Sequence, residues 1–106
     1  MPSAIEAFDQ GVEHVHNDEL RLAIEAFSEA IDSDPGLAIA YHGRGITHAI
    51  RGDLDRALRD FDEAIRLNSR APRFYHARAL VFREIGNEAQ AEADLRVYRR
   101  LSGDGE

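Results

Sequence analysis

The chain contains no cysteine, no tryptophan and no lysine, and only three of its 106 residues are proline. The absence of cysteine excludes disulfides, zinc–thiolate sites and cysteine nucleophiles. No run of about 20 apolar residues occurs, so neither a membrane-spanning helix nor a membrane partner is expected. The opening MPSAIEAF lacks the basic and apolar regions of a secretory signal, and a cytoplasmic location is expected.

The charge is negative overall and unevenly distributed along the chain. The net charge is -7, and residues 1–37 hold nine acidic residues and one arginine. A protein that binds nucleic acid needs a basic surface to neutralise the phosphates. No nucleic-acid partner is therefore expected. The 43% apolar and 31% charged content fits a folded helical protein rather than a disordered one.

Small residues recur at one fixed interval through the chain. The same interval separates Gly11 from Gly45 and Gly45 from Ala79. Two further rows keep it, and they consist of Ala23, Ala57 and Ala91 and of Phe27, Phe61 and Leu95. A fixed period of about 20–50 residues indicates stacked repeats, in which each unit buries its apolar face against its neighbours. The Gly11 row is expected to lie against the Ala23 row, so that the two helices of a unit approach closely.

Each repeat is expected to form two helices joined by a tight turn. Apolar residues recur at spacings of three and four, which predicts helices over residues 4–16, 19–32, 38–51, 54–67, 72–85 and 88–101. Turns are expected at Asn17-Asp18, Gly52-Asp53 and Gly86-Asn87, because these residue types tolerate left-handed backbone or cap a helix. The predicted fold class is an all-α solenoid of three helix–turn–helix units with six antiparallel helices. The units span about 4–37, 38–71 and 72–101 of a single domain, 1–106, and a short disordered tail, 102–106, follows.

The middle unit carries a pattern of residues that can be compared with that of a known repeat. Tyr41, Arg44, Gly45 and His48, followed by Ala57 and Phe61, resemble the tetratricopeptide repeat. The first unit matches through Gly11, Ala23, Phe27, Ala30 and Pro35, although Ala7 replaces the aromatic residue. The third unit matches through Tyr75, Ala79, Phe82, Ala91 and Leu95, so the resemblance covers residues 4–101. It implies a right-handed superhelix whose first helices line a concave groove that receives peptides or helices.

Polar residues occupy the two ends of the expected stack. Positions that face a neighbouring unit are apolar or small inside the stack, whereas their counterparts at the ends are Glu6, Glu13, Glu92 and Arg99. Terminal repeats need a polar outer face because no neighbour covers them. The pattern predicts a complete domain of three units.

The resemblance places a candidate binding groove on the first helices. Twelve residues are expected to line it: Ile5, Phe8, Val12, Val15, Ile39, His42, Ile46, Ile50, Arg73, His76, Leu80 and Arg83. An apolar stripe on an open concave face is typical of a partner-binding surface. The expected partner is an apolar or amphipathic segment whose polar end meets Arg73 and Arg83. Alternatively, these side chains cover one another and leave little surface exposed.

No catalytic, cofactor-binding or metal-binding site is expected. His42 and His76 lie one repeat apart, too far for joint ligation, and no i,i+4 histidine pair occurs. Acidic residues of the second helices, Asp60 among them, are expected on a solvated outer face. The carboxylate clamp of tetratricopeptide cochaperones is not expected, because its Lys and Asn donors are replaced by Phe8, Val12 and Gly43.

The sequence therefore predicts a non-enzymatic adaptor that binds another protein or peptide in its groove. The alternative is a self-assembling scaffold, in which the groove or contacts between the acidic first unit and the arginine-rich last helix join copies of the chain. Screening by salt would weaken such end-to-end contacts.

Overall fold

The computed structural model describes residues 2–103, which form six α-helices. They are α1 (Ala4–His16), α2 (Leu20–Ser33), α3 (Ala38–Ile50), α4 (Leu54–Leu67), α5 (Pro72–Glu84) and α6 (Glu88–Ser102). Each predicted helix is present, and its ends differ from the prediction by at most one residue. Ser102 belongs to α6, and Gly103 caps that helix in left-handed backbone. The rest of the predicted tail, 104–106, lies outside the described residues.

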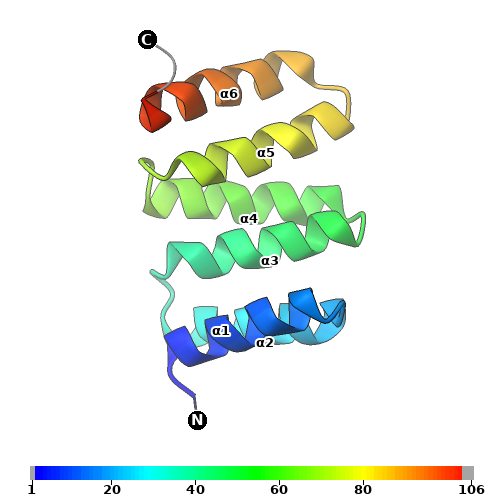
Figure 1. The fold of residues 1–106 in the computed structure, drawn as a ribbon, viewed down its shortest axis with the longest axis vertical. Coiled ribbons are helices and arrows are strands. Elements are labelled where there is room, and N and C mark those ends of the chain that lie inside the picture. The colour runs from blue at the N-terminus through cyan, green and yellow to red at the C-terminus, as the bar shows by residue number, and fades with distance from the viewer. Residues whose placement is uncertain (1, 104–106) are drawn as a thin grey trace.

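The helices pair into three hairpins that stack along one axis (Figure 1). The described stack measures 44 × 25 × 20 Å, and the chain passes through it from one end to the other. Between neighbouring units α2 packs on α3 and α4 on α5, and α1 also approaches α3 and α3 approaches α5. Within the described chain, no Cα atoms of α2, α4 and α6 come within 8 Å of one another. The first helices therefore form the inner, closely spaced layer of an all-α solenoid. The expected right-handed sense of the superhelix stays a prediction.

The turns within the hairpins recur in one backbone conformation. Asp18, Gly52 and Gly86 hold the same position in the three units, and their φ angles are 61°, 85° and 85°. The next residue caps the second helix in two units, since the side chain of Asp53 accepts from the Arg56 amide and that of Asn87 from the Gln90 amide. The predicted turns are confirmed, and left-handed backbone is their common physical cause. In the first unit the cap position is Glu19, whose side chain makes no capping bond.

Aromatic rings lie nearest to the repeated glycines of the first helices. An added Cβ on Gly11 would lie 2.6 Å from Phe27, and one on Gly45 would lie 2.7 Å from Phe61. The predicted apposition of the Gly11 and Ala23 rows stays a prediction, and the rings give a direct reason for a small residue at these positions. Ala23 and Ala57 are completely buried in the same core.

Positions that face a neighbouring unit are buried or partly buried inside the stack, and the equivalent positions at its two ends are exposed. Residues of α3 and α5 that face the preceding unit are buried, namely Ala40, Thr47, Phe74 and Val81. Their counterparts in α1, Glu6 and Glu13, are exposed, as are Glu92 and Arg99 on α6. None of the six described helices combines the length and the apolar character that a bilayer crossing needs.

Candidate partner-binding groove

Two adjoining hollows open on the side of the stack formed by the first helices. One, of about 240 Å³, lies between the first and second hairpins, and the other, of about 500 Å³, lies between the second and third. His42, Ile46 and Arg73 line both. Because the two hollows share a wall, they form one continuous surface that runs along the described stack.

Ten of the twelve predicted groove residues line these hollows. The first hollow holds Phe8, Val12, Val15 and Ile39, the second holds Ile50, His76 and Leu80, and both hold the three shared residues. Ile5 and Arg83 line neither. Beyond the twelve, the hollows are also lined by His16, Phe27, Ala49, Phe61, Val81 and Glu84, and by two small residues, Gly43 and Ala77. These two residues hold the same position in neighbouring units, so a second row of small residues was the available signal.

The groove residues differ in how much of their surface is free. Ile50 is 55% exposed and Leu80 is 51% exposed, which is unusual for large aliphatic side chains. Phe8 is partly buried, and its ring packs on Phe27 with centroids 5.6 Å apart. The alternative of mutual coverage thus holds for Phe8 at the first hollow and not for Ile50 or Leu80 at the second.

The two groove arginines have different surroundings. Arg73 is exposed and lies at the wall shared by the hollows. Arg83 donates to Glu88 at 2.9 Å and pairs with Glu92 at 3.4 Å, so two carboxylates of α6 neutralise its charge. Arg73 is therefore the cation that the groove offers, and Arg83 mainly joins α5 to α6.

His42 contributes an aromatic, uncharged surface to the shared wall. Its ring lies 5.0 Å from that of Phe74 and 5.9 Å from that of Phe61. Burial, with a smaller contribution from the nearby Arg73 cation, lowers the pKa of His42 from 6.5 to about 4. The imidazole is neutral at pH 7 and packs as part of the apolar lining.

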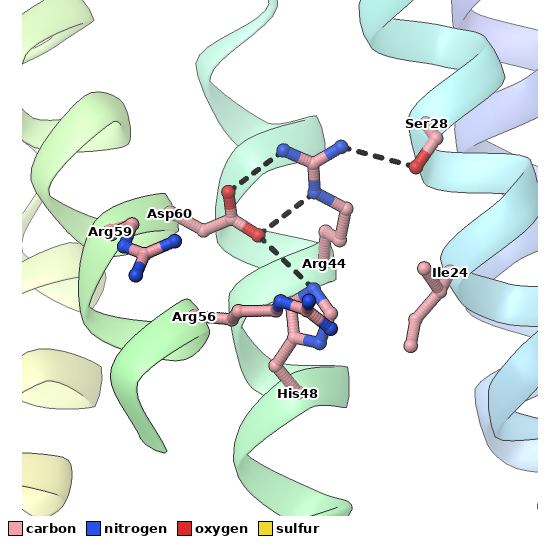
Figure 2. Close-up of a pocket in the computed structure, with 7 residues that line it drawn as sticks. All are labelled: Ile24, Ser28, Arg44, His48, Arg56, Arg59 and Asp60. Atoms are coloured by element: carbon pink, nitrogen blue, oxygen red, sulfur yellow. Dashed lines mark hydrogen bonds and ion pairs between the residues drawn. The ribbon is translucent and has the colours of Figure 1, made fainter. Parts of the chain in front are cut away.

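On the opposite side of the stack, two partly buried arginines pair with a carboxylate of their own hairpin and also bond the preceding hairpin. Arg44 of α3 donates to both oxygens of Asp60 on α4 at 2.9 Å and to the Ser28 hydroxyl on α2 at 3.1 Å (Figure 2). Arg78, at the same position of the next unit, makes the equivalent bonds to Asp94 and Asp62. The expectation of a solvated Asp60 is wrong, because this carboxylate is buried and its charge is paired bidentately.

These arginines lock one unit to the previous one. Arg44 and Arg78 each bond a helix of their own unit and the second helix of the preceding unit. The carboxylate partners raise the pKa of both guanidinium groups, which remain charged. Within residues 2–103 no three His, Asp or Glu side chains form a cluster suited to a metal ion.

Stacked helical hairpins with a lined concave face define the class of helical-repeat solenoid proteins. Residues 38–71 match the family model of the tetratricopeptide repeat. The middle hairpin is thus a tetratricopeptide repeat, and the described chain has the fold of three such units. A search of the curated proteins finds no relative of this sequence.

Solved structures share this fold at low sequence identity. The first tetratricopeptide domain of Spaghetti (RPAP3), bound to the HSP90 peptide SRMEEVD, has a TM-score of 0.93 at 18% identity, over 96% of this chain and 81% of that one. MamA has a TM-score of 0.90 at 23% identity, over 95% of this chain and 59% of that one. The chain thus spans less than two thirds of MamA.

A third similar structure is a secretion chaperone. The Yersinia enterocolitica type III chaperone SycD, in complex with a peptide of the translocator YopD, has a TM-score of 0.86 at 19% identity. The match covers 90% of this chain and 72% of that one. At such identities the likeness establishes the fold alone.

Proposed function

We propose that this protein is a non-enzymatic adaptor that binds an apolar or amphipathic segment of another protein along its concave groove. The observation that carries the proposal is the pair of joined hollows, in which Ile50 and Leu80 leave more than half of their surface uncovered. Proteins with the same fold hold peptides in two of the similar structures, which supports a peptide-sized occupant.

The lining of the groove favours an amphipathic helix with an acidic residue near its centre. Val12, Ile46 and Leu80 follow one another from the first unit to the third and would receive apolar anchors spaced i, i+3, i+4 and i+7. Arg73 stands beside them and would pair with a carboxylate of the occupant. Each fully buried aliphatic anchor contributes about 1.5–3 kcal/mol before the cost of ordering the segment is subtracted.

The test replaces the exposed groove residues and leaves the packed ones alone. Affinity capture from source cells, followed by mass spectrometry of the segments protected from protease, identifies an occupant. A synthetic peptide of that segment is then titrated into the wild type and into the Ile50→Ser/Leu80→Ser variant. We expect binding to weaken by about tenfold or more, since the variant removes two apolar contacts.

A matched control uses two other exposed aliphatic residues. Leu22 is 37% exposed and Ile85 is 49% exposed, and neither lines the groove hollows. The Leu22→Ser/Ile85→Ser variant is expected to bind the peptide as the wild type does. Equal loss in both variants, or unchanged binding in the groove variant, contradicts the proposal.

The second candidate function is self-assembly through unlike ends of the stack. Residues 1–37 are strongly acidic, while Arg96, Arg99 and Arg100 lie exposed on α6. Head-to-tail contact would then weaken between about 0.05 and 0.5 M salt, because the Debye length shortens. Sedimentation at both salt concentrations distinguishes the candidates, since a monomer throughout eliminates self-assembly. We also propose that the adaptor acts in the cytoplasm.

A further inference from the structure

A third hollow lies away from the groove, between the first and second hairpins. It has a volume of about 400 Å³ and is bounded by Ile24 and Ser28 of α2, Arg44 and His48 of α3, and residues of α4 (Figure 2). The α4 residues are Arg56, Arg59 and Asp60. Three guanidinium groups thus surround an open space in a protein whose net charge is -7.

Hydrogen-bond donors outnumber free acceptors in this hollow. Asp60 is the one carboxylate in its lining, and Arg44 already occupies both carboxylate oxygens. Arg59 forms no ion pair with any residue of the described chain, and Arg56 bonds only Asp53, through one guanidinium nitrogen at 3.3 Å. Several N–H donors of these two arginines therefore remain available to a ligand.

Two smaller donors complete the lining. The Ser28 oxygen accepts from Arg44, so its hydroxyl proton is free to bond elsewhere. His48 Nε2 lies 3.9 Å from the Asp60 carboxylate, too far for a hydrogen bond. One N–H of a neutral imidazole is also a donor. Together these groups present N–H and O–H bonds from three helices to the same space.

The junction between the second and third hairpins lacks this excess of donors, so the fold does not require it. At the equivalent positions one repeat later, Gln90 replaces Arg56, Ala93 replaces Arg59 and Asp62 replaces Ser28. Asp62 brings a second carboxylate, which accepts from Arg78 at 2.9 Å. The first junction therefore has an excess of positive charge, and the equivalent second junction has an excess of negative charge.

We propose that the hollow bounded by Ser28, Arg56 and Arg59 binds the phosphate group of a small phosphomonoester. A phosphate presents three terminal oxygens that accept bonds from donors on different sides, and guanidinium groups match such oxygens bidentately. The volume leaves room beside the phosphate, where Ile24 supplies an apolar wall for a small organic group. This site is independent of the groove.

Titration with inorganic phosphate, glycerol 2-phosphate and acetate at constant ionic strength tests the site. Amide chemical shifts in the nuclear magnetic resonance spectrum of the full chain report both location and affinity. We expect saturable shifts at Ser28, His48 and Arg59 with either phosphate compound, and at least tenfold weaker binding of acetate. The Arg56→Gln/Arg59→Gln variant is expected to weaken phosphate binding by at least tenfold.

Two further variants keep the test decisive. Arg96→Gln/Arg100→Gln removes the same charge from exposed positions of α6 and is expected to change phosphate affinity less than twofold. Ser28→Asp copies the second junction, in which the carboxylate pairs with the arginine of the following unit, and is expected to abolish binding with the fold intact. Shifts that do not saturate, equal weakening in both arginine variants, or undiminished binding by Ser28→Asp would each overturn the proposal.

Discussion

At the scale of single residues, a ring and a missing side chain determine how closely two helices approach. Phe27 and Phe61 are buried, and their rings lie only 2.6 and 2.7 Å from where the Cβ atoms of Gly11 and Gly45 would be. The third unit carries Ala79 and the smaller Leu95 at the equivalent positions. A larger residue on one helix thus accompanies a smaller one on the other, as close packing requires.

Gly45→Ala is expected to destabilise the protein by about 1–2 kcal/mol. Overpacking costs about 1–3 kcal/mol, and the better helix propensity of alanine offsets up to about 1 kcal/mol of it. Gly45→Ala/Phe61→Leu copies the third unit and is expected to lose less stability than the two single changes together. Urea unfolding of the four proteins in a double-mutant cycle measures this coupling.

Gly36→Ala is the control for that cycle. A Cβ at Gly36 would meet only Asp34 Oδ1, at an ordinary 3.5 Å, so its effect is expected to stay within about 0.5 kcal/mol. Strictly additive effects of Gly45→Ala and Phe61→Leu would contradict the packing argument.

At the scale of elements, α3 is the helix with the most neighbours in the described fold. It contacts α1, α2, α4 and α5. One side carries His42 and Ile46 into the groove, and the other carries Arg44 and His48 into the polar junction. Burial lowers the pKa of both histidines, so folding selects their neutral forms.

Stability is therefore expected to fall as the pH drops from about 6.5 to about 4. In that range the unfolded chain binds a proton at His42 that the folded chain excludes, and protonation favours unfolding. Each unit of pKa difference corresponds to about 1.4 kcal/mol at full protonation of the unfolded state. Chemical unfolding as a function of pH measures the slope.

His42→Phe places the residue of the equivalent first-unit position, Phe8, at this site and is expected to reduce the slope. Some slope remains because the pKa of His48 is lowered in the same direction. His16→Gln, at an exposed position, is the matched control and is expected to leave the slope in place. An unchanged slope in His42→Phe would assign the pH dependence to other groups.

At the scale of the whole molecule, the equivalent faces of α4 and α6 differ in polarity. Leu58 and Ile65 of α4 are partly buried by the third unit, whereas Glu92 and Arg99 hold the equivalent positions on exposed α6. The described chain thus stacks through internal apolar faces and presents polar side chains beyond its last helix. A polar face of this kind offers a neighbouring repeat no apolar surface to stack on.

Glu92→Leu/Arg99→Ile is expected to make copies of the chain associate through this face of α6. The double change restores the side chains of α4 on α6 and creates an exposed apolar patch. We expect concentration-dependent association in sedimentation equilibrium. Glu92→Gln/Arg99→Gln removes the same charges without adding apolar surface and is expected to associate no more than the wild type. Association of both variants would attribute the effect to charge.

Much of the fold could be predicted from the sequence because each signal in it is local and repeated. The helices and turns follow from apolar spacing and from residues such as Gly52 and Gly86, whose left-handed backbone ends a helix. Ten of the twelve residues predicted for the groove line the two hollows, because the family resemblance placed the first helices on that side. Three aligned copies reduce the ambiguity of any single position.

Contacts between side chains of the two helices of a unit were not predictable in the same way. Asp60 belongs to an acidic stretch that resembles a solvated face, yet Arg44 reaches it across the hairpin and buries it. Gly45 indicates a close approach but does not say that the Phe61 ring is its nearest neighbour. Arg83 was assigned to the groove because no sequence pattern reveals its bonds to α6.

The wall shared by the two groove hollows is expected to link them as binding subsites. A group bound in either one contacts Ile46 and Arg73 and is expected to restrict their rotamers, so that the other hollow then presents side chains that have already lost that freedom. Two short ligands are consequently expected to sense each other's presence, and by reciprocity each changes the affinity of the other by the same factor. A single segment long enough to reach across both bears that ordering cost once.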